Sequence, residues 1–488
     1  MFCGVKFPCH PTSIQANTLM RWMGCDRVIW NAKVDESNYY RKFALKFCPR
    51  EHYYATQDQS YSQFKSSELT PYLSQVPSQV LRNAAVRWYQ TLQKAIKGLC
   101  GFPKRKRKGN HASVYLTREL FRFEKAGKGY RLFIGTPKFP MGELRFSPHR
   151  SFKIPNSITV THHNGRFYLS FGYENNTKCL TLQQQFDRLR GMDTDTLTQG
   201  LVGVDMGITI PACSELANFD YSHSQKAHFK RADNKAKYLQ RRLSKQRYMA
   251  KTKGQPPSKR SNRTQQRLNA QHGRKANIRQ DFAHKTSRQL VDSATLGLVM
   301  EKLNIKGLTK RPKAVRDVNG HYLPNKAKAK AGLNHAMLSV GMYQIRLFSQ
   351  YKALSQNKAV FTIHPAYTSQ ECAVCGHIHP TNRTTQSKFV CTSCGNVDNA
   401  DHNAAIVIKN RGVTRLLDSG TELSGNHLSD TGHGGKVRRV KGKSLARTTD
   451  EVPKKMGRHT VLEATSLRTG SSPTLLLLLW RDYIRAKN

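Results

Sequence analysis

Residues 364 to 410 read HPAYTSQECAVCGHIHPTNRTTQSKFVCTSCGNVDNADHNAAIVIKN, and two kinds of site chemistry meet within this stretch. Its cysteines form a C-x2-C-x15-C-x2-C array, a spacing that is typical of a zinc ribbon held by four thiolates. The predicted ligands are Cys372, Cys375, Cys391 and Cys394. A zinc ion with four cysteine ligands has no open coordination position, so this site is expected to be structural rather than catalytic.

Asp401 follows the last of these cysteines by seven residues and opens a predicted helix of small and apolar side chains at 403–408. Such a helix can pack closely against a neighbouring element. Asp401, at the start of this helix, is therefore expected to face any molecule that the ribbon binds.

The charge of the chain is its most unusual overall property. Its 488 residues contain 81 Lys and Arg but 31 Asp and Glu, which gives a net charge of +50. Self-repulsion of this size favours a polyanionic partner, and nucleic acid is the leading candidate. The hydrophobic content of 38% is ordinary, so most of the chain should fold, as about three domains.

The remaining seven of the eleven cysteines are scattered, and we recognise no charged and apolar leader segment at the start. A reducing cytoplasm fits this pattern best. The longest apolar run, 475–480, is far shorter than the roughly 20 residues that span a bilayer. No membrane segment is expected.

The first half of the chain combines helical and strand patterns. Apolar residues have helical spacing at 16–47 and 78–99, and alternate with a period of two at 113–173 between Gly, Pro and Asn turns. We expect two core-forming helices and a small antiparallel barrel or sandwich. The basic loop GFPKRKRKGN at 101–110 lies between them and is a candidate phosphate contact. Its candidate residues are Lys104, Arg105, Lys106 and Arg107.

Strands and helices alternate in the second half, after a segment at 179–200 that reads as a polar linker. A helical pair is predicted at 226–290. Its residues 241–280 contain thirteen Lys or Arg and no acid, whereas a merely solvated helix would interleave both signs. We therefore predict a nucleic-acid surface with the residues Arg241, Arg242, Lys245, Arg247, Arg274 and Lys275.

Further along, residues 306–331 are basic and are predicted to form a loop or lid. A helix at 333–355 and a strand at 359–363 then lead into the ribbon. After Gly412 the composition is rich in Gly, Ser, Thr and Lys, which predicts a mobile tail.

Two more acids end buried apolar runs. Asp205 closes the strand LVGVD, and Glu301 closes LGLVME. Together with Asp401 they could hold two divalent ions, Mg2+ or Mn2+, for phosphodiester hydrolysis. The spacing alone is equally consistent with carboxylates paired to nearby arginines.

His377, Ile378 and His379 form a His-hydrophobic-His triplet. This triplet is the metal signature of single-strand transposases that attack with a tyrosine. It lies inside the cysteine loop, where decoration of a ribbon turn is the better interpretation.

Several motifs resemble one known family. They are GVDMG at 203–207, MEKLNIKGL at 300–308, TSQEC at 368–372 and DHNAA at 401–405, with looser agreement at GCDRVIWN (24–31), VPSQVL (76–81) and GFPK (101–104). They look like the split RuvC-like nuclease and zinc ribbon of TnpB, a transposon-encoded, RNA-guided relative of type V CRISPR effectors. The resemblance covers residues 1 to 412.

The resemblance implies an RNase H-like α/β nuclease domain with an inserted zinc ribbon, preceded by a β-barrel wedge domain that carries a helical recognition lobe. Asp205, Glu301 and Asp401 would be the catalytic metal ligands. A guide RNA and double-stranded DNA would be the partners, with sequence choice left to base pairing beside a short DNA motif. The implied domains are a wedge at 1–15 and 110–178, a recognition lobe at 16–109, a linker at 179–200, a nuclease domain at 201–363 and 396–412, a ribbon at 364–395 and a basic tail at 413–488.

One departure concerns the position before the third acid. The family often has Arg there, whereas this chain has Ala400, so a charge partner of Asp401 is expected to be missing. Two alternatives remain beside a transposon-encoded nuclease: a compact CRISPR effector with the same chemistry, and a guide-dependent repressor that binds DNA without cutting it. The sequence does not reveal the oligomeric state.

Overall fold

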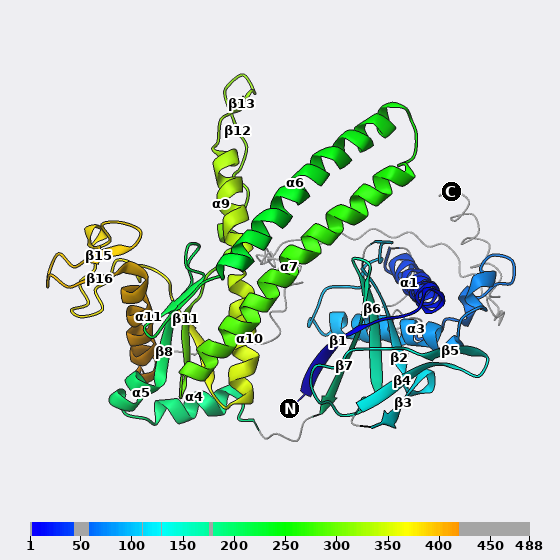
Figure 1. The fold of residues 1–488 in the computed structure, drawn as a ribbon, viewed down its shortest axis with the longest axis horizontal. Helices are drawn as coiled ribbons and strands as arrows, with labels where there is room; N and C mark the ends of the chain where they lie inside the picture. The colour runs from blue at the N-terminus through cyan, green and yellow to red at the C-terminus, as the bar shows by residue number, and fades with distance from the viewer. Residues whose placement is uncertain (1, 43–57, 110, 128, 175–178, 419–488) are drawn as a thin grey trace, which may run out of the picture. The chain divides into compact units, whose positions relative to one another are not determined.

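The computed structural model describes residues 2–42, 58–109, 111–127, 129–174 and 179–418 (Figure 1). Residues 419–488 of the predicted tail lie outside these residues. The prediction of a mobile tail is wrong for 413–417, which end the helix α11 (Ala400–Leu417) and bury Val413 and Leu416. The described residues divide into two compact units, one made of residues 10–146 and 157–160 and the other of residues 2–9, 147–156 and 161–418. Among the described residues, no helix is both long and apolar enough to cross a membrane.

The helices α1 (Ser13–Lys42) and α3 (Ser78–Ile96) form the helical part of the first half. The predicted stripe of α3 is buried at Val80, Leu81 and Trp88, whereas its last member, Ile96, is exposed at the end of the helix. Trp88 and Leu92 pack on Trp30 and Val34 of α1. The prediction that these aromatic residues form a core is therefore confirmed.

The residues with a period of two form strands, as predicted. One sheet has the strand order β1-β7-β6-β2 and another has the order β3-β4-β5. Strand β1 is antiparallel to β7, and β4 is antiparallel to both β3 and β5. The strands are β1 (Phe2–Cys9), β2 (His111–Thr117), β3 (Phe121–Ala126), β4 (Gly129–Thr136), β5 (Phe139–Glu143), β6 (Ser157–His163) and β7 (Arg166–Glu174).

A five-stranded sheet with the order β10-β9-β8-β11-β14 lies at the centre of the second half. Its strands β8, β11 and β14 run parallel, and β9 and β10 add antiparallel neighbours. The parallel strands are continuous apolar runs because both faces of the sheet are covered by helices. The strands are β8 (Leu201–Asp205), β9 (Ala212–Ser214), β10 (Asn218–Phe219), β11 (Gly297–Glu301) and β14 (Ala359–Ile363).

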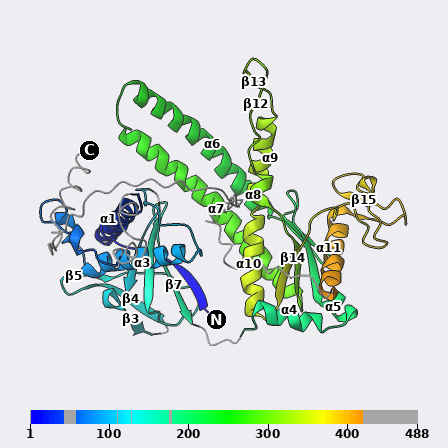
Figure 2. The same ribbon diagram turned by 180° about the vertical axis from the view of Figure 1, so that it is seen from behind.

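Alternate residues of this sheet face two separate cores. Val202, Val204 and Met300 pack with the helices α7 (Lys259–Ser293) and α10 (Met342–Ser355). Leu201 and Val299 pack on the opposite face with α4 (Leu182–Arg190), α5 (Thr194–Gly200) and α11 (Ala400–Leu417). Figures 1 and 2 show α11 on the side of the sheet away from α7 and α10.

Two expectations about helices need correction. The segment 179–200, expected to be a polar linker, forms α4 and α5, which bury Phe186, Leu189 and Leu197 against the sheet. The predicted helix at 333–355 is two helices, α9 (Ala327–Val340) and α10, because Gly341 adopts a φ of +83° between them. A side chain disfavours that conformation, which glycine adopts freely.

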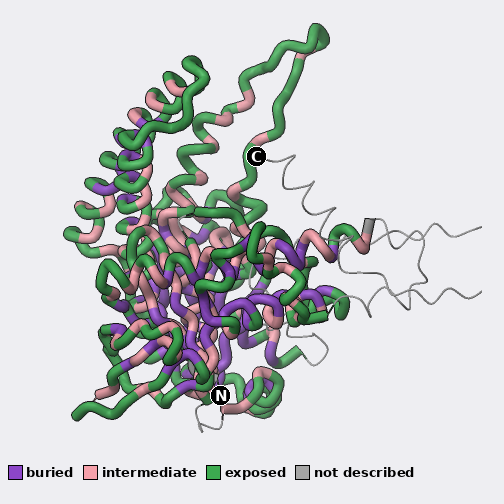
Figure 3. The backbone as a smooth tube through the Cα atoms, turned by 90° about the vertical axis from the view of Figure 1, so that its right-hand side faces the viewer, coloured by how far each residue is buried: buried purple, intermediate pink, exposed green. Residues whose placement is uncertain are grey.

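The predicted helical pair is confirmed as α6 (His223–Thr252) and α7, which form a long hairpin. Its own core is small and comprises Ala236, Leu239, Leu243 and Leu268. Figure 3 shows burial concentrated around the sheets, while much of the long helices is exposed. The predicted lid contains α8 (Ile305–Leu308), β12 (Val315–Arg316) and β13 (Tyr322–Leu323). The ribbon extends past its predicted end at 395, because its strand β15 (Lys388–Val390) pairs with β16 (Val397–Asn399).

Candidate active site and metal centre

Two glycines let α11 lie directly on the sheet. A Cβ added to Gly203 of β8 would lie 2.0 Å from the carbonyl oxygen of Ala405, and one added to Gly412 would lie 2.6 Å from a methyl of Val299 on β11. Real Cβ atoms do not approach other atoms this closely. The helix is therefore seated across both strands at backbone contact distance.

The same geometry fixes where two of the predicted acids point. Side chains two residues apart on a strand share a face, so Asp205 faces the same side as Gly203, and Glu301 faces the same side as Val299. That side is covered by α11. The parallel register pairs Val204 with Met300, so the two acids that follow end neighbouring strands at the same level, with strand axes about 4.8 Å apart.

Asp401 reaches this face from α11. It lies in the first turn of the helix, one turn before the Ala405 carbonyl that contacts Gly203. The structure thus brings the three predicted acids to one edge of the sheet from positions about a hundred residues apart. The charges of Glu301 and Asp401 both act on Asp205.

The electrostatics of the acids reflect this crowding. Burial, followed by the charges of Glu301 and Asp401, raises the pKa of Asp205 to about 7. Burial also raises the pKa of Glu301, which is 8% exposed, although the Thr368 hydroxyl donates a hydrogen bond to it and the charge of Arg411 favours its ionised form. A cluster of carboxylates that resists ionisation is one that a bound cation would stabilise.

Arg383 is a member of this site that the sequence did not reveal. Its guanidinium donates to Oδ1 of Asp401 at 3.1 Å and to the Gln386 carbonyl at 2.7 Å, and its charge lowers the pKa of Asp205. Arg383 lies in the loop between the two cysteine pairs, and its distance along the sequence from Asp401 does not indicate that the two side chains pair.

Arg383 also supplies the charge partner of Asp401 that was expected to be missing because position 400 is an alanine. The Ala400 side chain is fully buried in a cluster with Cys372, Phe389 and Cys391, so an arginine could not occupy that position without disrupting the cluster. The expectation that Asp401 lacks a charge partner is wrong, because the ribbon loop supplies one.

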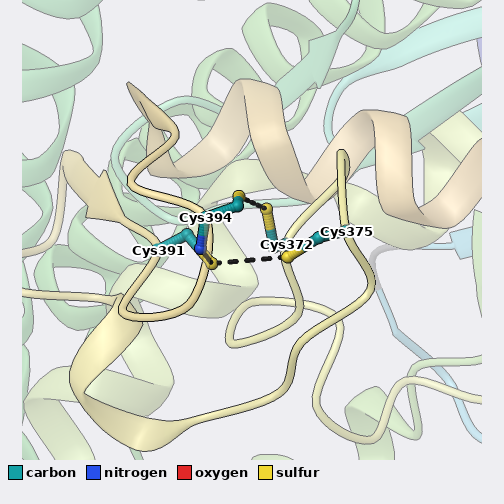
Figure 4. Close-up of side chains that lie close together, drawn as sticks. All are labelled: Cys372, Cys375, Cys391 and Cys394. Atoms are coloured by element: carbon teal, nitrogen blue, oxygen red, sulfur yellow. Dashed lines mark hydrogen bonds between the residues drawn. The ribbon is translucent and has the colours of Figure 1, made fainter.

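The four predicted zinc ligands converge, as Figure 4 shows. Their sulfur atoms all lie within 4.8 Å of one another, and the pairs Cys372 with Cys394 and Cys375 with Cys391 are each separated by 3.6 Å. These separations are too long for disulfides, whose S–S bond is about 2.0 Å. They fit a tetrahedron around zinc, since a Zn–S distance of about 2.3 Å gives edges of about 3.8 Å.

Among the described residues, the thiols are the one set of three or more potential ligands gathered this tightly. The three carboxylates are therefore more widely spaced.

Hydrogen bonds join the ribbon to the active-site helix. The Asn403 amide donates to the Glu371 carbonyl at 2.7 Å and accepts from the Ala373 N–H at 2.9 Å. Arg411 pairs with the Glu371 carboxylate. Asn399, the last residue of β16, caps α11 by accepting from the N–H of Asp401. The helix that carries the third acid thus begins inside the ribbon.

The predicted nucleic-acid contacts of the hairpin divide into two groups. Arg241, Lys245 and Arg274 are exposed. Arg242 is half-buried. Arg247 donates to Gln265 of α7 at 2.8 Å, and Lys275 is buried at 8% exposure in an ion pair with Asp233 at 2.6 Å. Lys275 is therefore unavailable to a phosphate.

The basic loop of the first half is similarly divided. Arg105 pairs with Asp35, and Lys106 pairs with Asp26 at 3.1 Å and lies over the Trp30 ring. These two side chains fasten the loop to α1. Lys104 and Arg107 are exposed and remain the candidates for phosphate contact.

The His377 and His379 rings are exposed and lie parallel, 6.0 Å apart, within the ribbon. His379 contacts Thr381 of the same loop. This placement matches decoration of a ribbon turn, and it lies outside the named strands.

Comparisons with known proteins agree with the motifs. Residues 343–408 match the model of a Cas12f1-like TNB domain, and residues 1–42 match a helix-turn-helix domain of the OrfB_IS605 type. In the structure this second region consists of β1 and the single long helix α1.

Two curated relatives match most of the chain. "Putative RNA-guided DNA endonuclease InsQ" of Escherichia coli is 27% identical over 406 residues, which cover 82% of this chain and 90% of InsQ. A protein of Streptomyces pristinaespiralis with a similar name is 24% identical and covers 82% of this chain and 87% of its own length. The CRISPR-associated endodeoxyribonuclease Cas12f1 of Sulfoacidibacillus thermotolerans is 31% identical over 29% of each chain.

Among solved structures, a Cas12f1 complex with single guide RNA and target DNA covers 84% of this chain and 99% of its own at 12% identity, with a TM-score of 0.46. The match to InsQ along most of both chains, together with the two family models, confirms the resemblance to the TnpB family that the motifs indicate.

Proposed function

We propose that this protein is an RNA-guided DNA endonuclease that hydrolyses phosphodiester bonds next to a short DNA motif, encoded by a transposable element. The observation that carries the proposal is the seating of α11 on Gly203, which gathers Asp205, Glu301 and Asp401 at one edge of the sheet. The names of the two relatives that match most of the chain support the same activity.

Asp205, Glu301 and Asp401 would hold two divalent cations, Mg2+ or Mn2+. Such ions activate a water molecule and stabilise the leaving oxygen of the phosphodiester. Hydrogen bonds within the chain orient two of these carboxylates. The Thr368 hydroxyl donates a hydrogen bond to Glu301, and Arg383 donates one to Asp401. Oxygen ligands of this kind suit hard cations.

Guidance by RNA would leave sequence choice to base pairing, so the protein needs charge more than base-reading side chains. The net charge of +50 and the exposed arginines and lysines of the α6–α7 hairpin meet that need. The partners would be a guide RNA and double-stranded target DNA. The ribbon zinc would be structural.

The test is cleavage by the protein purified with its co-expressed RNA, incubated with matched DNA and Mg2+. Wild type should cut, Asp205→Ala should not, and Asp187→Ala, which removes an exposed acid of α4, should cut like wild type. If wild type cuts no better than Asp205→Ala while both still bind matched DNA, the protein is a guide-dependent repressor and the nuclease proposal is wrong.

A further inference from the structure

One face of α6 combines aromatic and basic side chains in a regular pattern. Tyr238, Arg241, Lys245 and Tyr248 are spaced by three, four and three residues, and all four are exposed. We call these four residues the outer stripe. Residues at this spacing lie along one side of a helix.

The outer stripe faces away from α7. The buried side of α6 is formed by Ala236, Leu239 and Leu243, which pack toward Leu268 of α7. At 100° per residue, the outer stripe lies on the opposite side of the helix. Tyr238 and Tyr248 keep 60% and 70% of their surface exposed. Their rings are therefore presented to the surroundings rather than used in the hairpin core.

The charge around the outer stripe has one sign. Asp233 is the sole acid of α6, and it is already bound by Lys275 at 2.6 Å and by Lys237 at 2.9 Å. No acid follows it until Asp281. A partner of this surface must therefore be a polyanion.

The rings decide which form of nucleic acid suits the surface. Phosphates need only cations such as Arg241 and Lys245, and a duplex hides the faces of its bases. Exposed aromatic rings beside cations are the arrangement that binds unpaired nucleotides, because every base has a face that can stack. The two tyrosines lie ten residues apart, about 15 Å along the helix axis, a distance that a few nucleotides span.

We propose that the outer stripe of α6 binds an unpaired stretch of nucleic acid, with bases stacked on Tyr238 and Tyr248 and phosphates at Arg241 and Lys245. The identity of the bound molecule rests on the proposed function: it is an unpaired segment of the guide RNA. The displaced strand of the target DNA offers the same chemistry and is distinguished by the test below.

The test uses the full-length protein without divalent ions and measures fluorescence anisotropy with three probes: a short single-stranded RNA, the same sequence as DNA, and the matching RNA duplex. The variant Tyr238→Ala/Tyr248→Ala should lose about tenfold or more in affinity for single-stranded RNA. Its affinity for the duplex, and the slope of affinity against salt, should not change, because no charge is removed.

Three controls isolate stacking. Tyr238→Phe/Tyr248→Phe should bind single strands like wild type, because it keeps both rings. Arg241→Gln/Lys245→Gln should lower the salt slope for all probes. Tyr343→Ala, which removes a tyrosine that is 42% exposed on α10, should have no effect.

If the alanine variant lost more affinity for single-stranded DNA than for single-stranded RNA, the outer stripe would be assigned to the displaced DNA strand instead of the guide RNA. The proposal is wrong if the alanine variant binds single strands like wild type, if it loses duplex affinity equally, or if the phenylalanine variant loses as much as the alanine variant. Should the alanine variant not fold, cross-linking of 4-thiouridine RNA to the wild type decides: adducts at Tyr238 or Tyr248 support the proposal, and adducts confined to other residues overturn it.

The binding assay needs no cleavage, so its outcome is independent of the nuclease proposal. Asp205→Ala should bind all three probes like wild type. A protein that stacks RNA on α6 but does not cut DNA would retain the inference and lose the nuclease activity.

Discussion

The face of the sheet under α11 and the α6–α7 hairpin are built by opposite means. Under α11, the backbone at Gly203 meets the Ala405 carbonyl, and apolar residues fill both sides of the sheet. The hairpin has four buried apolar residues in the core between its own helices, and its residues 241–280 contain thirteen Lys or Arg and no acid. The first region fixes atoms in place, which metal-dependent chemistry requires. The second distributes charge, which a flexible polyanion requires.

The largest expected effect comes from the ribbon, which joins the first region. Cys391→Ser removes one thiolate of a four-thiolate site, so the protein should lose its one equivalent of zinc. The ribbon would then release Arg383 and the cap of α11. Displacing a catalytic group by about 1 Å can cost on the order of 100-fold in rate, and we expect a loss of at least that size.

Zinc content by atomic spectroscopy and cleavage rate are the two readouts. Cys100→Ser, which changes an exposed free cysteine outside the ribbon, is the control. Retention of a full equivalent of zinc by Cys391→Ser would contradict the proposed ligation.

Gly203→Ala tests the close contact of the first region directly. The added methyl would overlap the Ala405 carbonyl, so α11 must move outward and carry Asp401 with it. Overpacking of this kind costs about 1–3 kcal/mol of stability, and we expect cleavage to fall by about tenfold or more, while RNA binding by the hairpin persists.

Gly24→Ala is the matched control, because a Cβ at Gly24 meets nothing within 4 Å. Equal cleavage by Gly203→Ala and Gly24→Ala would show that the seating of the helix does not set the geometry of the acids.

Asp205→Asn should abolish cleavage yet stabilise the metal-free protein. Because the pKa of Asp205 is raised from 3.8 to about 7, the folded protein keeps a proton there that the unfolded chain loses. The contribution of this proton to the stability of the wild type is therefore lost as pH rises between about 4 and 7. The variant does not lose it, because asparagine does not ionise. We expect its melting temperature to exceed that of wild type by a few degrees above pH 7 and to match it below pH 4.

The measurement is thermal unfolding in a chelating buffer across this pH range, with Asp187→Asn as the exposed control. Added Mg2+ should stabilise wild type more than Asp205→Asn. A gap between the two proteins that does not change with pH would exclude burial of the charged carboxylate as its cause.

The smallest effect belongs to single charges of the hairpin. Each lost phosphate contact lowers the salt slope of nucleic-acid affinity by about 0.7 to 0.9. Arg241→Gln/Lys245→Gln should therefore lower the slope by about 1.5, whereas Arg288→Gln should change it less, because the charge of Arg288 is already paired with Asp292 at 2.8 Å. Equal slopes for both variants would place the nucleic acid elsewhere.

Local patterns in the sequence were sufficient for much of this structure. The ribbon could be predicted because its ligands lie within 23 residues and their spacing determines the metal geometry. The parallel strands, the helical hairpin and the position of each acid at the end of an element could be predicted from apolar runs and periods.

The features that were missed depend on contacts between distant segments. The helices α4 and α5 offer few apolar residues each, and their burial becomes evident once the sheet beneath them exists. The pairing of Arg383 with Asp401 depends on how the ribbon loop folds back. In the sequence Lys275 cannot be told from its basic neighbours, because Asp233, its ion-pair partner, lies 42 residues earlier.

The start of α11 inside the ribbon has a consequence for how the protein matures. A ribosome completes the strands that carry Asp205 and Glu301 long before it reaches Asn399, so the nascent sheet can form while its third acid is still missing. With zinc bound as proposed, we expect a freshly made chain to lack nuclease activity until the ion closes the ribbon and positions the start of α11. Supplying zinc to metal-free protein should switch cleavage on with little change in total helix content by circular dichroism.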